Sequence, residues 1–299
     1  MNLVDLSART LGQLGDVGPF SFGMWRFTDA DLNRRTELVD AALSSGMNLI
    51  DTADVYGLDW NGTGFGTVES ALGEVLQHRP EIRDQIVLAT KGGIVPPTPY
   101  DSSPAAITAA CEASLQRLQV ETIDLYQIHR PDMFVHPEAL AKALSSLRDA
   151  GKIREVGVSN HTIAQTAALQ TFLPFPMLTT QPQYSALDLT PLRDGTFDHC
   201  MASAITPMAW SPLAGGRLAT GEGVPPQLLT VLDDIAARED TDRAGVALAF
   251  VLAHPSRPIA IVGSQSVDRL RGTAASADIN LDRNDVYAII QASEGVPLP

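Results

Sequence analysis

Eight short apolar runs, separated by longer segments with helical spacing, constrain the fold of this chain more than any other feature. Each run is rich in Val, Ile, Leu or aromatic residues and has the length of a buried strand. In chain order the runs are FSFGMW beginning at Phe20, MNLID (47–51), QIVLATK (85–91), IDLYQIH (123–129), IREVGVSN (153–160), MLTTQ (177–181), ITPMAW (205–210) and IAIVG (259–263).

Strands that alternate with helices pair in parallel through right-handed crossovers. Eight such units over 299 residues predict an α/β fold, a closed (β/α)8 TIM barrel that forms one domain over 1–299. An open doubly wound sheet is the alternative. No GxGxxG motif joins the first strand to a helix, so a dinucleotide site of the Rossmann type has no local support.

Residues typical of helix ends lie between the apolar runs. Ser103 directly before Pro104 is typical of an N-cap and the first helical position, and Gly46 and Gly151 are typical of left-handed helix exits. The segment 103–118 places apolar residues at helical spacing, which predicts an amphipathic helix. Its inner face would carry Ile107, Cys111, Ser114, Leu115 and Leu118.

The composition argues against several kinds of partner and compartment. With 44% hydrophobic and 19% charged residues, the chain can bury a substantial core. A net charge of −14 disfavours binding to phosphate backbones or anionic lipid surfaces. Cys111 and Cys200 are too few for a disulfide framework, and the N-terminus lacks a secretion signal. We therefore expect a cytoplasmic protein without a nucleic-acid or membrane partner.

Polar side chains end most of the expected strands. Asp51, Lys91, His129, Ser159 with Asn160, and Gln181 end strands two to six in turn. The carboxyl ends of barrel strands meet at one face, where the active sites of such barrels are built. We expect these side chains to converge there. Each residue alone has a structural alternative, because parallel strands also need polar exits.

Asp51, Tyr56, Lys91 and His129 form a workable chemical set. A nearby ammonium group favours the ionised form of a phenol, so Lys91 is expected to lower the pKa of Tyr56. Asp51 could hold Lys91 charged, and His129 could donate a hydrogen bond to a carbonyl oxygen. Tyr56 would then protonate that oxygen as hydride reaches the carbon. No cluster of metal ligands is present, so we expect no metal.

Long motifs along the chain resemble those of the aldo-keto reductases, in the order that this family has them. They are GMWRF, NLIDTADVYG, ESALGEVL, LATKGG, DLYQIHRPD, VGVSNHT, MAWSPLAGGRL and IVGSQSVDRL. IHRPD and MAWSPLAGG resemble a bacterial subgroup of uncharacterised or sugar-aldehyde oxidoreductases. The resemblance implies carbonyl reduction by a catalytic tetrad of Asp51, Tyr56, Lys91 and His129, with Tyr56 as the general acid.

The resemblance also implies a nicotinamide cofactor, NADP(H) with NADH as the alternative, extended over the barrel mouth. It implies carboxamide contacts from Ser159, Asn160 and Gln181, and a stacking face from Trp210. Taken alone, a tryptophan at a strand end is more often a core residue. The implied cofactor residues are Trp25, Ser159, Asn160, Gln181, Trp210, Ser211, Leu213, Gly215, Arg217, Gly263, Ser264, Gln265 and Arg269.

The phosphate-binding residues in this set come from two segments. SPLAGGRL offers a hydroxyl, close-approach amides and Arg217 to the pyrophosphate, although a tight turn with a solvated arginine is the structural alternative. GSQSVDRL would hold the 2′-phosphate through Arg269, beside an N-cap at Ser266. Many relatives carry lysine where this chain has Gly263, so one cation worth on the order of 1.5–3 kcal/mol is missing.

The substrate pocket is expected to include Arg26, Trp60 and Arg130, together with Trp25. The arginines could pair with an anionic or polyhydroxy substrate, and the tryptophans could stack on a sugar ring or an aromatic aldehyde. As an alternative, Asp132 or Asp124 could neutralise Arg130 in a structural ion pair. We expect a small carbonyl compound as the ligand and no obligate protein partner.

The same residues are also compatible with two other functions. Lys91 at a strand end could form a Schiff base in an aldolase or lyase, although Asp51 would keep it charged and a poor nucleophile. Alternatively, the chain could bind a nicotinamide cofactor without turnover and report the redox state to a partner. Borohydride trapping and a carbonyl panel distinguish these functions from a reductase.

Overall fold

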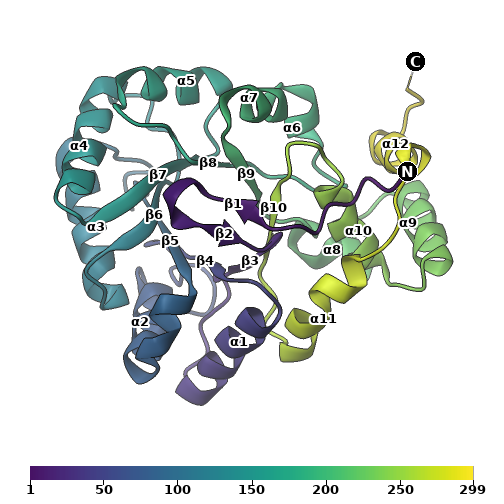
Figure 1. The fold of residues 1–299 in the computed structure, drawn as a ribbon, viewed down its shortest axis with the longest axis horizontal. Coiled ribbons are helices and arrows are strands. Elements are labelled where there is room, and N and C mark those ends of the chain that lie inside the picture. The colour runs from purple at the N-terminus through teal and green to yellow at the C-terminus, as the bar shows by residue number, and fades with distance from the viewer. Residues whose placement is uncertain (299) are drawn as a thin grey trace.

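A computed structural model of the chain, which describes residues 1–298, contains a closed barrel of eight parallel strands. The expected fold is therefore confirmed. Around the barrel the strands run in the order β10-β3-β4-β5-β6-β7-β8-β9 (Figure 1). Their bounds are β3 Phe20–Gly23, β4 Leu49–Asp51, β5 Val87–Gly92, β6 Ile123–Ile128, β7 Ile153–Ser159, β8 Thr179–Gln181, β9 Thr206–Ala209 and β10 Ile259–Val262.

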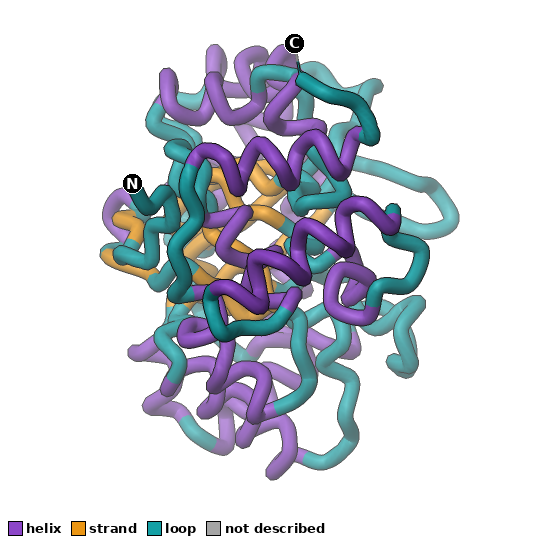
Figure 2. The backbone as a smooth tube through the Cα atoms, turned by 90° about the vertical axis from the view of Figure 1, so that its right-hand side faces the viewer, coloured by secondary structure: helices purple, strands orange, loops and turns teal. Residues whose placement is uncertain are grey.

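Helices form a layer around the barrel, with the strands enclosed at the centre (Figures 1 and 2). The main helices are α1 Leu32–Ser44, α2 Thr67–His78, α3 Pro104–Leu118, α4 Pro137–Asp149, α5 Ile163–Phe172, α7 Thr196–Ser203, α9 Pro226–Arg238, α10 Arg243–Leu252, α11 Val267–Ala277 and α12 Arg283–Glu294. Shorter pieces are η1 Gly12–Leu14, η2 Pro80–Gln85, α6 Thr190–Arg193, η3 Ala214–Gly216 and α8 Arg217–Thr220. The apolar faces of the main helices pack on the outer surface of the barrel. This packing forms the larger of two hydrophobic cores.

An antiparallel hairpin, β1 Arg9–Thr10 and β2 Asp16–Val17, closes one end of the barrel. Leu11 and Val17 are fully buried and join the second core inside the barrel. That core also contains Val87 and Ile259, which begin their strands, so the hairpin covers the amino ends of the strands. Figure 2 shows the hairpin at the left and longer loops at the right of the strands.

The helix-end residues act as their types predict. The Ser103 hydroxyl caps α3 by accepting from the amide of Ala106, with Pro104 as the first helical residue. Gly46 and Gly151 have φ values of 77° and 71°, a left-handed conformation that costs glycine little. Ile107, Cys111, Ser114 and Leu118 form the buried face of α3, and Leu115 is partly buried. These local predictions are confirmed.

Several strands are shorter than their apolar runs. FSFGMW leaves the barrel after Gly23, and ITPMAW leaves it after Ala209. The two tryptophans that end these runs, Trp25 and Trp210, therefore lie in loops beyond the strands. Apolar character alone could not mark this boundary, because the loop residues also pack against protein. None of the helices within residues 1–298 combines the length and the apolar character that a membrane span requires.

Candidate active site

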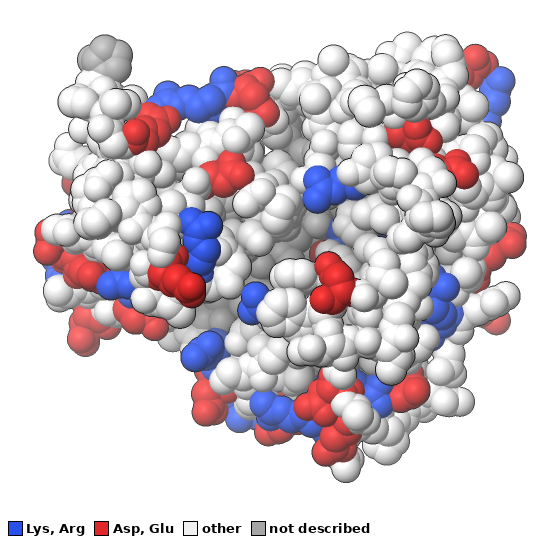
Figure 3. Space-filling model, turned by 180° about the vertical axis from the view of Figure 1, so that it is seen from behind, with Lys and Arg blue, Asp and Glu red and all other residues white. Residues whose placement is uncertain are grey.

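The carboxyl ends of the barrel strands bring the predicted polar residues together. Asp51 lies opposite Ala89 of β5, Lys91 lies opposite Gln127 of β6, and Ser159 lies opposite Gln181. These ends open on the face opposite the hairpin. Figure 3 shows this face, which is hollowed near its centre, with both basic and acidic side chains along the edge of the hollow.

Lys91 is the centre of the catalytic candidates. Its side chain is fully buried, and its Nζ donates to Asp51 Oδ2 at 2.7 Å, to the Thr52 carbonyl at 2.9 Å and to Tyr56 Oη at 3.2 Å. An ammonium group has three protons, and here three acceptors take them. The predicted contacts of Lys91 with Asp51 and Tyr56 are therefore present.

Asp51 is held from its other side by two amides. Its Oδ1 accepts from Gln181 Nε2 at 2.9 Å and from Gln127 Nε2 at 3.2 Å. Asp51 is 2% exposed, so its carboxylate has lost its hydrating water. These two hydrogen bonds and the contact with Lys91 compensate for that loss. The network fixes Asp51 and, through it, the position of Lys91.

Burial and the neighbouring charges shift the pKa of Lys91 in opposite directions. Burial alone would lower the pKa of this ammonium group. The charges of Asp51 and Tyr56 and the hydrogen bonds to them outweigh burial and raise that pKa above its ordinary value. Lys91 therefore stays charged at neutral pH.

The prediction that Tyr56 has a lowered pKa is wrong. Burial raises the pKa of the Tyr56 phenol, and Asp51 raises it further, so the opposing effect of Lys91 does not prevail. The physical reason is burial, because a phenolate at this place would lose its water, and the attraction of Lys91, partly offset by Asp51, does not compensate for that loss. Tyr56 therefore stays protonated at neutral pH, as a proton donor must.

His129 lies beside Tyr56, with ring centroids 5.8 Å apart and planes almost perpendicular. Burial, and then the charges of Lys91 and Arg130, hold the pKa of His129 well below its ordinary value, so the imidazole is neutral. Its buried Nδ1 has no hydrogen-bond partner among the described residues. A neutral imidazole carries one N–H, which can donate to a ligand oxygen.

Four of the predicted carboxamide and stacking residues also form one group. Ser159 Oγ donates to the Gln181 carbonyl at 3.0 Å and accepts from Asn160 Nδ2 at 2.8 Å. Asn160 Oδ1 in turn accepts from the indole Nε1 of Trp210 at 2.9 Å. Trp210 is partly exposed and so is not a pure core residue. Their contacts with a nicotinamide remain a prediction.

The predicted pyrophosphate segment is a tightly turned loop. Ser211 has a φ of 52°, Gly215 a φ of 73°, and Leu213 directly precedes η3. Arg217 begins α8 and donates to the Gly223 carbonyl at 3.3 Å. Arg26, from the loop after β3, donates to the Gly215 carbonyl at 3.3 Å and so ties this loop to the pocket side of the mouth.

The predicted 2′-phosphate segment follows β10. Ser266 caps α11 by accepting from the amide of Arg269, as predicted, and Gly263 is exposed. Arg269 is exposed and forms no ion pair within residues 1–298. Gln265 accepts at its carbonyl a hydrogen bond of 3.1 Å from Arg34 of α1, which also pairs with Glu37 at 2.6 Å.

The predicted pocket residues come from separate loops. The guanidinium carbon of Arg26 lies 4.5 Å from the ring centroid of Trp60 and 5.6 Å from that of Trp25. The two indoles are in contact, with centroids 5.1 Å apart. Both are more than a third exposed, so their outer faces are open to a ligand.

The alternative that Asp132 or Asp124 neutralises Arg130 is wrong. Asp132 accepts from the amides of Ser102 and Phe134, and Asp124 pairs with Arg83 and Arg154. Within the described part of the chain Arg130 has no ion pair, and its guanidinium carbon lies 6.0 Å from the Trp210 ring.

Sequence reasoning missed Gln127 and Thr52, which form hydrogen bonds with Asp51 and Lys91 respectively. The alternation along β6 carried the signal for Gln127. Leu125 faces the barrel interior, so Gln127 and His129, two and four residues later, face the same way. Thr52 contributes only its backbone carbonyl, and every residue has one, so the residue type could not predict this contact.

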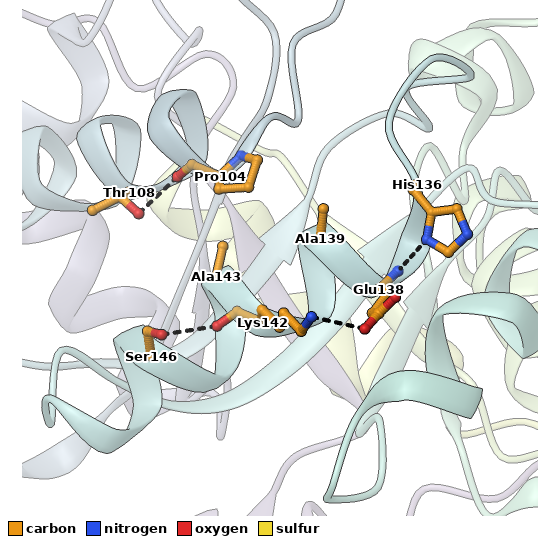
Figure 4. Close-up of a pocket in the computed structure, with 8 residues that line it drawn as sticks. All are labelled: Pro104, Thr108, His136, Glu138, Ala139, Lys142, Ala143 and Ser146. Atoms are coloured by element: carbon orange, nitrogen blue, oxygen red, sulfur yellow. Dashed lines mark hydrogen bonds and ion pairs between the residues drawn. The ribbon is translucent and has the colours of Figure 1, made fainter.

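Outside the barrel, a shallow groove lies between the start of α3 and the outer face of α4 (Figure 4). Its polar groups already pair with one another: Lys142 with Glu138, the Thr108 hydroxyl with the Pro104 carbonyl, and Ser146 with the Lys142 carbonyl. It therefore offers no free set of groups for chemistry. Across residues 1–298 no three His, Cys, Asp or Glu side chains are placed to hold a metal ion.

Comparison with known proteins places the chain in a family. The model of the Aldo/keto reductase family matches residues 19–294. A 6-dehydroglucose reductase of Novosphingobium aromaticivorans is 43% identical over 97% of both chains, and one of Agrobacterium fabrum is 32% identical over 92% of this chain and 93% of its own. An aldo/keto reductase from Klebsiella pneumoniae, solved with NADP and acetate, is 25% identical with a TM-score of 0.77, over 98% of this chain and 96% of that one. The chain belongs to the aldo/keto reductase family of oxidoreductases.

Proposed function

We propose that this chain is an NADPH-dependent reductase of a small sugar aldehyde, with 6-dehydroglucose as the first candidate. The observation that carries the chemistry is the buried Lys91 ammonium, which lies between the Asp51 carboxylate and the Tyr56 hydroxyl. The relative of 43% identity, named as a 6-dehydroglucose reductase, supports the substrate class.

The residues at the mouth fit a nicotinamide cofactor. Ser159, Asn160 and Gln181 provide donors and acceptors of the kind that a carboxamide needs, and the partly exposed indole of Trp210 provides a flat apolar face. When bound, NADPH supplies the hydride.

The protein's own groups then handle the oxygen of the substrate. The neutral imidazole of His129 donates a hydrogen bond that orients the carbonyl, and Tyr56 gives its proton to the same oxygen. Lys91 stabilises the phenolate that this transfer leaves, because its ammonium already contacts Tyr56 Oη at 3.2 Å. Asp51, Gln127 and Gln181 hold Lys91 in place.

A preference for NADPH over NADH rests on Arg269. The side chain is exposed and has no acidic partner in the described residues, so its guanidinium is free to pair with a 2′-phosphate. Gly263 supplies no second cation. We therefore expect a real but moderate preference for NADPH.

The sugar-aldehyde class fits the pocket side of the mouth. Trp25 and Trp60 offer stacking faces, and Arg26 and Arg130 offer donors that match hydroxyl groups. Figure 3 shows the hollow open to solvent, as a small polar substrate requires.

The Schiff-base alternative has less support. Formation of an imine needs a neutral amine, whereas Lys91 has a raised pKa and gives all three ammonium protons to acceptors. The reductase uses the ammonium as it stands, so the geometry favours reduction.

The test is to mix the purified protein with NADPH and a panel of aldehydes, 6-dehydroglucose first, and to follow the loss of NADPH absorbance. We expect saturable turnover, faster with the sugar aldehyde than with simple aliphatic aldehydes. Tight binding of NADPH without turnover of any carbonyl would favour the redox-sensing function instead. Failure to bind NADPH, with borohydride trapping on Lys91, would favour the Schiff-base function.

A further inference from the structure

The loop 57–66, on the substrate side of the mouth, is held at its tip by side chains from another loop. In the described part of the chain, one hydrogen bond joins the tip, residues 59–62, to the rest of the protein: Trp25 Nε1 donates to Asp59 Oδ1 at 3.3 Å. The ring of Trp60 lies against that of Trp25, with centroids 5.1 Å apart. The position of the tip therefore depends on the loop after β3.

The turn 24–28 in that loop is anchored in the core. Met24 and Phe27 are fully buried, and the Phe27 amide donates to the Met24 carbonyl at 2.8 Å, which closes the turn. Trp25 and Arg26 lie between these two anchors. Their backbone is therefore fixed, while their side chains reach the neighbouring loops.

Arg26 contacts both sides of the barrel mouth. Its guanidinium carbon lies 4.5 Å from the ring centroid of Trp60, and its Nη2 donates to the Gly215 carbonyl at 3.3 Å. Gly215 belongs to the loop proposed to hold the pyrophosphate. Among the described residues, this is the one hydrogen bond that joins residues 211–216 to a part of the chain distant in sequence. The loops on both sides of the mouth are thus held through Arg26.

The contact with Trp60 orients the Arg26 side chain. A guanidinium group over an indole face is attracted by the ring and can still donate hydrogen bonds in its own plane. The Nε of Arg26 is buried without a hydrogen-bond partner in residues 1–298, so the Gly215 carbonyl and the two indoles hold the group. Without the Trp60 ring, the long side chain would regain rotamer freedom by leaving the Gly215 carbonyl.

We propose that Trp60 is a positioning residue for the loop 211–216. Its ring keeps the Arg26 guanidinium on the Gly215 carbonyl, so the loop stays in place and NADPH leaves slowly. Because Trp60 belongs to the substrate side of the mouth, the substrate loop and the cofactor loop are coupled, and such coupling between two ligands is reciprocal. This inference rests on the proposed binding of NADPH by the loop that contains Gly215.

The experiment measures the rate constant of NADPH dissociation from the full chain, by stopped-flow fluorescence after mixing the NADPH complex with excess NADP⁺. Trp60→Leu removes the aromatic face, so dissociation should become about three- to fivefold faster, as expected from the loss of one cation–π contact. Trp60→Phe keeps a ring that attracts a cation less strongly, so its rate should lie between those of the wild type and Trp60→Leu.

Phe65→Leu is the matched control on the same loop. Phe65 is also partly exposed, but its ring lies 5.7 Å from the guanidinium carbon of Arg117 and not beside Arg26. This variant should leave NADPH dissociation unchanged. An equal acceleration in Phe65→Leu and Trp60→Leu would overturn the proposal, because it would show a general loosening of the loop.

A double-mutant cycle tests whether Trp60 acts through Arg26. In the Arg26→Met background, adding Trp60→Leu should change the dissociation rate by less than about twofold, because the contact is already lost. Effects that multiply would show that Trp60 acts independently and would overturn the proposal.

The outcome for the wild type separates this inference from the proposed function. If the wild type binds NADPH and Trp60→Leu releases it at the same rate, the inference alone is overturned. A Trp60→Leu protein that loses stability without releasing NADPH faster would also overturn it, because the role of Trp60 would then be structural. A wild type that binds no NADPH would refute the proposed function, and the inference with it.

Discussion

The sequence predicts the contacts of Lys91 correctly, but it does not predict the pKa of the neighbouring Tyr56. The position of Lys91 at a strand end and its pairing with Asp51 follow from the pattern of the chain. The direction of the Tyr56 pKa does not follow, because it depends on burial, and burial outweighs the opposing effect of the Lys91 ammonium. Residue types identify the groups that take part, whereas their protonation states can be predicted only when their packing is known.

Arg269→Ala tests the residue that should read the 2′-phosphate. Loss of a charge-assisted hydrogen bond of about 1.5–3 kcal/mol should raise the Kd for NADPH by roughly 10- to 100-fold and leave the Kd for NADH nearly unchanged. Fluorescence titrations with each cofactor measure both values. An equal loss for the two cofactors would place Arg269 away from the phosphate.

The neutral state of His129 predicts a pH dependence of stability. Its folded pKa lies well below that of the unfolded chain, so the unfolded state binds a proton first as the pH falls below about 6.5. The wild type should therefore lose stability below that pH by up to about 1.4 kcal/mol per pH unit from this residue. Urea unfolding between pH 7 and pH 5 should show a shallower decline for His129→Gln. Parallel curves for the two proteins would show that His129 is not held neutral.

At the scale of elements, the barrel strands and the capped helices were predictable, whereas the loops were not. Alternating runs gave the strands, and Ser103 with Pro104 gave the start of α3. Contacts between loops that are distant in the chain left no local signal. The hydrogen bond from Arg26 to Gly215, which joins the loops after β3 and β9, spans 189 residues.

Arg26→Met tests that connection. The methionine keeps the apolar contact with Trp60 but cannot donate to the Gly215 carbonyl, so the loop proposed to hold the pyrophosphate should be held less firmly. Loss of about 1.4 kcal/mol would weaken NADPH binding about tenfold. The weaker binding should appear as faster dissociation of NADPH, and stopped-flow measurement gives the rate constant of that dissociation. Lys142→Met, in the outer groove, is the control and should leave release unchanged.

At the scale of the whole molecule, the apolar core inside the barrel and the polar network of the candidate site lie at opposite ends of the barrel. The hairpin and the apolar core fill the amino end of the strands, and the polar network occupies the carboxyl end. The barrel itself was predictable from eight repeated units, because a closed sheet is the arrangement that buries all of them. The hairpin was not, since β1 and β2 have only two residues each.

Leu11→Ala tests this separation. Leu11 is fully buried in the segment that joins the two strands of the hairpin closing the barrel, so its truncation should cost about 2–5 kcal/mol of unfolding free energy. The kcat should remain within about twofold of the wild type, because the site lies at the other end. Urea unfolding and steady-state kinetics on the same sample check both statements. A large fall in kcat with little loss of stability would contradict the separation.

The most direct test of the central claim is the rate of NADPH-dependent aldehyde reduction by the wild type and by Tyr56→Phe. Removal of the phenolic proton should lower kcat by about 10²- to 10⁴-fold, the usual contribution of a general acid, and leave the Kd for NADPH within about twofold. The matched binding would show that the site is intact. An unchanged kcat in Tyr56→Phe would contradict the account, because the proton would then come from another group.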